Sequence, residues 1–404
     1  MSDTLNRDAL TIPADQLLSA YEQRLECRKA ILEERDRQLG KDRIRISSYM
    51  ENIGWPELFG YDMNRFYADP PFAFETDLRQ RIFWLDNSLD DDLPGFWMGA
   101  TVGMYFDITL FGQAVSHTRI GVPEFGHHPI ADQPDLSLIP PVAFRTSGMM
   151  PVLLRRYEMM RQISETRYGN KISIGFPEFG RGPLDVLVQL RGYANFAADT
   201  VERPQFVHDF LARIVSERVR WNRERRRYLG IPEPGSHLHF ALGGEVPNGD
   251  VTPPTTRIDD DWVNVPFISP AIFREFVLPA YRQIAASEGK VVGFHTCGNL
   301  VPVVQDLLGV FPGIQTLDVS AWNDFERLDA MLDPKIGFWL GFKNTFVLAG
   351  TPAQHRELVE RVARLGRRRK VGVCAQAIVR LHETYEENLS RVNAFIRLAR
   401  EIFA

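Results

Sequence analysis

Short apolar runs alternate with longer amphipathic stretches along most of this chain of 404 residues. Seven runs of about five residues predict β-strands, at 96–100, 171–176, 237–242, 290–294, 314–319, 336–340 and 370–374. Apolar residues at helical spacing between and after them predict helices, at 205–228, 270–287, 300–310, 352–365 and 383–403. A strand followed by a helix, repeated along the chain, is typical of parallel strands joined by crossover helices.

About eight such units fill the chain from Trp55 onward, with no internal repeat or linker between them. No G-x-G-x-x-G turn follows any predicted strand, so the pattern favours a (β/α)8 TIM barrel over an open doubly wound sheet. We therefore predict two parts, an N-terminal helical arm at 1–55 and the barrel at 56–404.

The arm is rich in charge between residues 13 and 43, and its leucines recur at loosely helical spacing before a stop at Gly40. The favoured interpretation is a helix that covers one end of the main domain. A cap over the pocket or over a neighbouring subunit is the alternative, so a homodimer stays open. Cys27 falls inside this helix, and we expect it to be inert.

Composition narrows the class of protein. The chain is 44% hydrophobic and 25% charged, as in ordinary globular proteins, and its net charge of −5 gives no basic stripe for nucleic acid or a membrane surface. Three cysteines, no signal peptide and no apolar stretch near ~18 residues predict a cytoplasmic protein without a disulfide framework.

The strongest candidate chemistry lies at the ends of two predicted strands. His295 and Cys297 follow the run at 290–294, and Cys374 ends the run at 370–374. One imidazole and two thiolates suit Zn²⁺ and leave a fourth position for substrate or water. Parallel strands would bring these residues to one rim. The alternative is that Cys374 is a small buried hydrophobe and His295 a core histidine.

The other candidates each carry a functional and a structural interpretation. Asp318 ends the strand at 314–317 and either orients His295, contacts substrate or caps the next helix. Glu245 and Asp250 lie in a Gly- and Pro-rich loop, 243–261, that either closes over the site or is solvated. His237 and His239 share a face and form either an alternative metal pair or, as is more usual, packing residues. The large apolar candidates indicate either an apolar pocket that suits aromatic groups or, equally, barrel core: Met104, Tyr105, Phe106, Phe338 and Trp339.

Two segments together resemble the uroporphyrinogen decarboxylase superfamily, namely residues 268–279 and the motif Phe-His-Thr-Cys-Gly-Asn at 294–299. The resemblance extends more weakly from about residue 96 to the end, through Gly-Pro-Leu at 182–184, Leu-Arg-Gly at 190–192, 203–208 and Gly-Thr-Pro at 350–352. It implies a (β/α)8 barrel with its pocket at the carboxyl ends of the strands.

The H-x-C…C pattern is similar to the zinc-dependent methyltransferases of that superfamily, which exchange a methyl group between the cobalt of a corrinoid protein and a small substrate. The resemblance implies that His295, Cys297 and Cys374 bind zinc, and we assign Gly298 and Asn299 of the same motif to cofactor binding. It also implies a cobalamin (corrinoid) cofactor, which we expect on a separate partner protein. The substrate would be a methoxylated aromatic or other methyl donor, or a thiol acceptor.

The sequence departs from the decarboxylases themselves. It lacks their N-terminal arginine-rich segment, and Cys374 replaces their late histidine. Phe106-Asp107-Ile108 does resemble their aspartate segment, so Asp107 is predicted to face the pocket, or else to pair with a local donor. We assign catalytic roles to Asp318, Asp107 and Glu245. The alternatives are a metal-independent decarboxylase or lyase acting through Asp107, and a non-catalytic zinc-binding barrel closed by Glu245 or Asp318.

Overall fold

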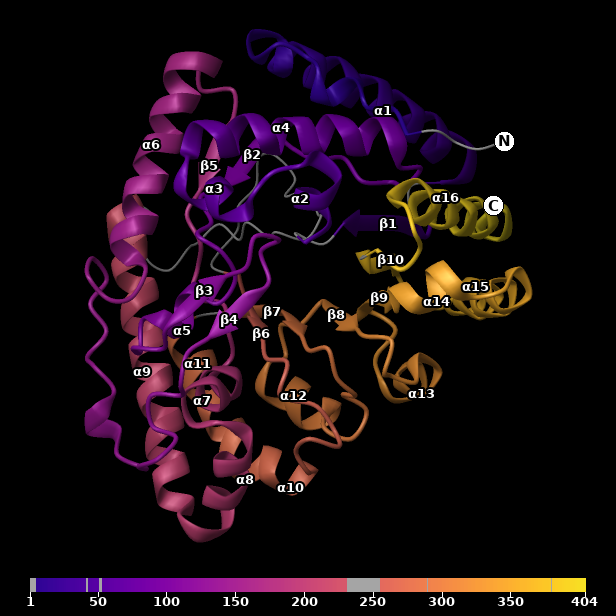
Figure 1. Cartoon of the computed structure of the whole chain (residues 1–404). Coiled ribbons are helices and arrows are strands. Elements are labelled where there is room, and N and C mark those ends of the chain that lie inside the picture. Colours follow the sequence, from indigo (N-terminus) through magenta and orange to yellow (C-terminus); the bar gives the residue numbers. More distant parts are fainter. Residues whose placement is uncertain (1–4, 41–42, 51–52, 231–254, 289, 379) are drawn as a thin grey trace.

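A sheet of six parallel strands forms the centre of the molecule (Figure 1). The computed structural model describes residues 5–40, 43–50, 53–230, 255–288, 290–378 and 380–404. The strand order is β1-β10-β9-β8-β7-β6, and every neighbouring pair is parallel. All six carboxyl ends therefore lie at one edge. The strands are β1 (Arg45–Met50), β6 (Thr255–Asp259), β7 (Lys290–His295), β8 (Thr316–Val319), β9 (Gly337–Phe342) and β10 (Val371–Ile378).

Four shorter strands lie outside this sheet. β2 (Trp97–Gly99) and β5 (Ser173–Gly175) pair in parallel, and β3 (Val115–His117) and β4 (Pro123–Phe125) form an antiparallel hairpin. A single parallel bridge between Arg181 and Asp259 joins the segment after β5 to β6. Within the described ranges the fold is thus α/β, with eight parallel strands in two sheets that are not hydrogen-bonded into one closed barrel.

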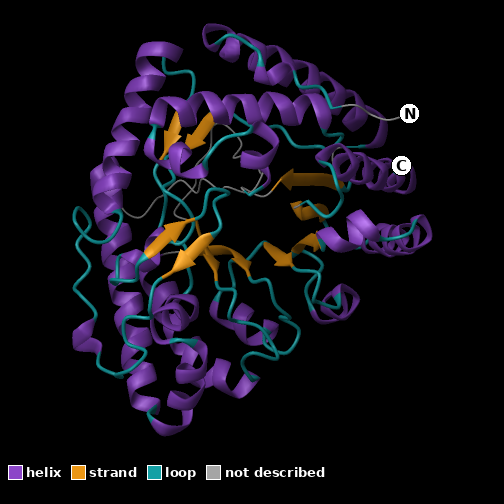
Figure 2. Ribbon diagram, viewed as in Figure 1, coloured by secondary structure: helices purple, strands orange, loops and turns teal. Residues whose placement is uncertain are grey.

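Helices surround these sheets, and the long helices α4 and α6 lie on the side of β2 and β5 (Figures 1 and 2). A π-helical turn (Phe273–Val277) joins α10 to α11. The described part of the chain has no helix with both the length and the apolar character needed to span a membrane. The helices are α1 (Leu17–Leu39), α2 (Gly54–Phe59), α3 (Met63–Ala68), α4 (Pro70–Asn87), α5 (Phe106–Thr109), α6 (Met150–Tyr168), α7 (Pro183–Arg191), α8 (Tyr193–Glu202), α9 (Pro204–Leu229), α10 (Pro270–Ile272), α11 (Leu278–Glu288), α12 (Val304–Val310), α13 (Phe325–Met331), α14 (Asn344–Ala349), α15 (Pro352–Gly366) and α16 (Tyr385–Phe403).

Most of the predicted elements are confirmed. Six of the seven predicted strands correspond to β2, β5, β7, β8, β9 and β10, and all five predicted helical segments are helical. Helix α15 begins at the residue that the sequence predicts, because Thr351 and Gln354 form a reciprocal cap around Pro352 at the helix start. The predicted strand at 237–242 lies outside the described residues.

The range assigned to the helical arm contains a long helix and one strand of the main sheet. Helix α1 packs against α4 and buries Leu17, Tyr21 and Leu25. After it, β1 pairs in register with β10, so that Ser47 lies beside Cys374. This strand was not expected, because Arg45, Ser47 and Ser48 interrupt its apolar pattern. The division of the chain at residue 55 stays a prediction.

A buried carboxylate connects the arm, β1 and the C-terminal helix. Asp91 accepts hydrogen bonds from Arg35, from Arg43 Nη1 at 2.7 Å, from Arg400 Nη2 at 3.1 Å and from the backbone N–H of Ile46 at 2.9 Å. Burial alone would raise the pKa of Asp91, but these donors outweigh burial and hold it below its usual value. Asp91 therefore stays ionised and joins three segments distant in sequence.

Candidate metal centre

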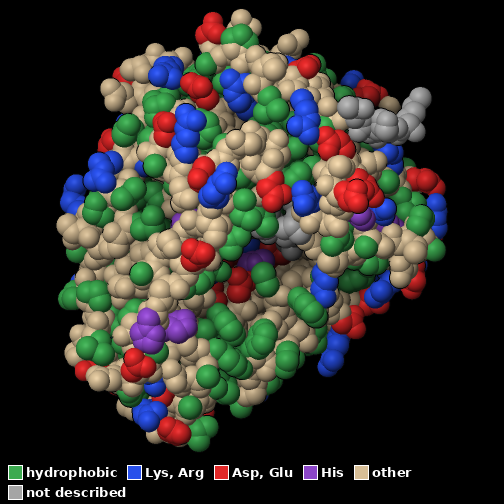
Figure 3. All heavy atoms as spheres, viewed as in Figure 1, with side chains coloured by type: hydrophobic (Ala, Val, Ile, Leu, Met, Phe, Trp, Pro, Cys, Tyr) green, Lys and Arg blue, Asp and Glu red, His purple; other side chains and the backbone are tan. Residues whose placement is uncertain are grey.

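Two of the predicted ligands, His295 and Cys297, lie where the carboxyl ends of β6, β7 and β8 meet. Asp259 is in register with His295, and Asp318 is in register with Trp339. Neighbours in register on a parallel sheet point to the same face. Figure 3 shows a hollow over this region, in which acidic and histidine side chains gather and hydrophobic side chains line the border.

His295 is oriented by the next strand. Its Nδ1 lies 2.7 Å from Asp318 Oδ2, and the same oxygen accepts a hydrogen bond from Arg257 Nη2 at 3.2 Å. Only 7% of the Asp318 side chain is exposed. A carboxylate on Nδ1 places the imidazole proton there and leaves the Nε2 lone pair free to bind a metal. The structure thus brings Asp318 into the orienting position considered from sequence.

Cys297 and Asp261 complete a compact group with His295. Cys297 Sγ lies 3.5 Å from His295 Nε2, and Asp261 Oδ1 lies 3.4 Å from the same nitrogen. The three ligand atoms are all within 4.8 Å of one another. An imidazole nitrogen, a thiolate and a carboxylate oxygen are all donors that Zn²⁺ accepts, so the donor set fits this ion.

Asp261 was missed from sequence. It follows β6 within the stretch predicted as a loop at 243–261, and that prediction is wrong at its end, because residues 255–259 form a strand paired with β7. The run Asp259-Asp260-Asp261 at the end of this strand was the available signal. Glu245, Asp250, His237 and His239 lie outside the described residues.

The turn after β7 is fixed by close packing against the segment after β6. Thr296 Oγ1 donates to the carbonyl of Val263 at 3.0 Å, and the Asn299 N–H donates to Asn264 Oδ1 at 3.1 Å. A Cβ on Gly298 would lie 2.1 Å from Asn264 Cγ. Gly298 and Asn299 therefore shape the turn that presents Cys297, and their assignment to cofactor binding stays a prediction.

We expect Gly298→Ala to lower the free energy of unfolding by about 1–3 kcal/mol, because the added methyl group has to displace Asn264. The measurement is the denaturant midpoint. Gly309→Ala in α12 is the matched control, since its Cβ would meet nothing within 4 Å, and we expect that variant to be as stable as the parent or slightly more so. Equal midpoints for both variants would contradict this account of the turn.

Cys374 shares the face of the sheet but not the compact group. It pairs with Gly341 and Ser47, two positions beyond the register of Asp318 and Trp339. Its thiol is buried, and burial raises the pKa of Cys374 well above its usual value despite the Ser47 hydroxyl. Its separation from His295 follows from the two strands, β8 and β9, that lie between β7 and β10. Zinc ligation by Cys374 stays a prediction.

Asp107 belongs to a second charged group beside the site. Its Oδ1 lies 3.4 Å from Arg181 Nε, and Arg181 also bonds Asp185 and stacks on Tyr105 with its Cζ 4.0 Å from the ring centroid. Burial and the nearby Asp261 raise the pKa of Asp185 to about 6, although Arg181 lowers it. Asp107 therefore has the local partner considered from sequence, and its catalytic role stays a prediction.

The apolar candidates separate in the structure. Phe106 packs on Trp221, and Phe338 is buried beneath Arg369. Met104 is exposed. Trp339 points to the face of His295 and lies over Gly372, where a Cβ would come within 2.2 Å of the indole. Of the five, Trp339 is the residue whose register places it beside the metal group.

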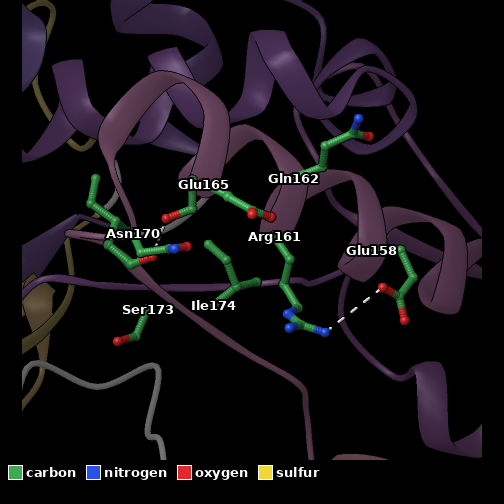
Figure 4. A pocket seen from close by; sticks show the side chains of 9 residues that line it. Glu158, Arg161, Gln162, Glu165, Asn170, Ser173 and Ile174 are labelled. Carbon is green, nitrogen blue, oxygen red and sulfur yellow. Dashed lines mark hydrogen bonds and ion pairs between the residues drawn. The ribbon is translucent and has the colours of Figure 1, made fainter.

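A separate groove lies between α6 and β5 (Figure 4). It has a volume of about 360 Å³ and is lined mainly by polar side chains of α6, including Glu158 and Arg161, which form an ion pair at 3.9 Å. None of the predicted ligands lines it.

The fold has a solved counterpart. The chain resembles a methyltransferase from Methanosarcina mazei with a TM-score of 0.60 and 16% sequence identity, over 90% of this chain and 95% of that one. At this identity the likeness shows the fold. No protein-family model and no curated protein matches the sequence.

Proposed function

We propose that this protein is a zinc-dependent methyltransferase that moves a methyl group between a corrinoid cofactor and a small substrate. The arrangement of His295, Cys297 and Asp318 at the carboxyl ends of parallel strands carries the proposal. The likeness of the fold to a protein named as a methyltransferase supports it. We also propose that the eight parallel strands form the (β/α)8 barrel that the sequence predicts.

In this proposal His295, Cys297 and Cys374 hold the zinc ion. Bound zinc would supply Lewis acidity, which stabilises a substrate thiolate or polarises the heteroatom that carries a methyl group. Asp318 keeps the imidazole in the tautomer that offers Nε2. Trp339, on the same face of the sheet, is suited to contact an apolar or aromatic part of the substrate.

The methyl carrier in this proposal is a cobalamin held by a separate corrinoid protein. Its cobalt would have to approach the hollow of Figure 3. The substrate is a methoxylated aromatic or other methyl donor, or a thiol acceptor, and the direction of transfer follows from which of these is used.

Metal content tests the proposal without knowledge of the substrate. We expect about one zinc ion per chain in the purified full-length protein and loss of zinc in both Cys297→Ala and Cys374→Ala. Cys27→Ala is the matched control, because Cys27 is exposed on α1, away from the strand ends. Zinc should stay bound in that variant.

Activity is then measured with reduced cobalamin and a panel of methyl donors, and with methylcobalamin and thiols. A folded wild type without metal would contradict the proposal and favour a metal-independent decarboxylase or lyase acting through Asp107. Zinc bound with no methyl transfer in either direction would favour a non-catalytic zinc protein.

A further inference from the structure

We propose that Asp261 is a displaceable ligand of the metal, which holds the fourth coordination position in the resting protein and leaves it when a substrate thiol binds. This inference rests on the proposed zinc site. It adds Asp261 to the ligands of the H-x-C…C pattern. Whether Asp261 is bound or displaced would decide whether the fourth position is open to substrate.

The first support is geometric. Asp261 Oδ1 lies 3.4 Å from His295 Nε2, and Cys297 Sγ lies 3.5 Å from the same nitrogen. The atoms thus surround one small volume, since all three fall within 4.8 Å of one another. Bonds of about 2.0–2.3 Å from zinc to N, O and S place tetrahedral ligands at separations of this size.

The second support is the contrast between three successive carboxylates. Asp259 accepts a hydrogen bond from Arg257 Nε at 2.7 Å. Asp260 is fully buried and accepts from the backbone N–H groups of Leu184 and Asp185 and from the Tyr281 hydroxyl. Asp260 is therefore fully engaged away from the metal group, and the carboxylate of Asp259 pairs with Arg257 and not with a member of the metal group.

Asp261 differs from both neighbours. The contacts of its carboxylate are with the two other members of the metal group: the Cys297 N–H donates to Oδ1 at 2.9 Å, and His295 Nε2 lies at 3.4 Å. Among the described residues no Lys or Arg lies within 4 Å of its carboxylate. Its side chain is 38% exposed, so it has room to rotate away from the metal without unfolding the turn.

The third support is ligand chemistry. The proposed ligands His295, Cys297 and Cys374 would leave one tetrahedral position, and Asp261 would fill it. A substrate would then have to replace one of the four ligands. A carboxylate oxygen is harder than an imidazole nitrogen or a thiolate, and zinc is a borderline-soft ion. A thiol that enters as thiolate, with its proton released to water, would therefore displace Asp261 before the other ligands. Arg181 lies within electrostatic range of the freed carboxylate.

The experiment uses the full-length protein and its cobalt(II)-substituted form. Asp261→Ala and the nearly isosteric Asp261→Asn are compared with the wild type, and Asp259→Asn is the matched control for loss of one charge at the end of β6. Zinc affinity is measured by competition with a chromophoric chelator. Thiol binding is measured by titrating 2-mercaptoethanol and following the sulfur-to-cobalt charge-transfer band.

We expect both Asp261 variants to bind zinc about tenfold or more weakly, and to bind the thiol at about tenfold lower concentration, because no carboxylate has to be displaced. Asp259→Asn should match the wild type in both measurements. If zinc and thiol affinities of the Asp261 variants equal those of the wild type, Asp261 is not a ligand. A wild type that binds no zinc would instead contradict the proposed function itself.

Discussion

Replacing Asp318 with alanine is expected to weaken zinc binding by about 10- to 100-fold. Asp318 Oδ2 lies 2.7 Å from His295 Nδ1, and without it the imidazole is free to rotate and to adopt the tautomer that protonates Nε2. Because the carboxylate is nearly buried, few water molecules can replace it. Zinc affinity is measured by chelator competition, and the folded state is checked by circular dichroism.

Asp318→Asn is the companion variant. Its amide oxygen still accepts a hydrogen bond from His295 Nδ1 but carries no charge, so we expect an intermediate loss of affinity. A zinc affinity unchanged in Asp318→Ala would show that His295 is oriented by other contacts, or that it is not a ligand.

Replacing Asp91 with alanine is expected to lower the free energy of unfolding by about 3–5 kcal/mol. The change leaves Arg43, whose side chain is 2% exposed, without one of its two carboxylate partners, and it leaves Arg35 and Arg400 without the carboxylate they share. The measurement is the urea or guanidinium midpoint at neutral pH. Asp132→Asn is the control, because Asp132 is 83% exposed beside His127, and its midpoint should not change.

The pH dependence of this contribution has a defined sign. The pKa of Asp91 in the folded protein is below its usual value, so its contribution is complete above the unfolded pKa of about 3.9 and is lost as pH falls through the lower folded value. The stability difference between the wild type and Asp91→Ala should therefore be constant from pH 5 to 7. A difference that disappears at pH 5 would contradict the assignment.

The hydrophobic pattern of the sequence was sufficient to predict the strands that are apolar along their whole length. The strands β7, β9 and β10 were predicted within a few residues of their observed bounds, because parallel strands covered on both faces consist of nearly continuous apolar residues. β1 and β6 were missed for the opposite reason. Residues 255–259 are Thr-Thr-Arg-Ile-Asp, and the charged side chains that point to the site remove the apolar pattern.

The residues of the candidate site also divide into those that the sequence could bring together and those that it could not. His295 and Cys297 lie in one turn, so sequence spacing was enough to pair them, and Asp318 was suggested by its position at the end of an apolar strand. Asp261 comes from another strand, and its proximity depends on the β6-to-β7 register, which no local pattern reports. The same limit applies to Arg181, whose contacts with Asp107 and Asp185 join segments on either side of β5.

The run of three aspartates after Ile258 makes the metal group and the start of α7 sensitive to the deletion of a single residue. Asp259 and Asp261 point to one side of the chain and Asp260 to the other, where it holds the start of α7. Deleting any one of the three gives the same shortened sequence, with Asp-Asp followed by Trp262, and it would leave one of the three positions without its carboxylate. Point substitutions here should be graded in effect, whereas a deletion that barely alters composition should abolish either the helix start or the metal group.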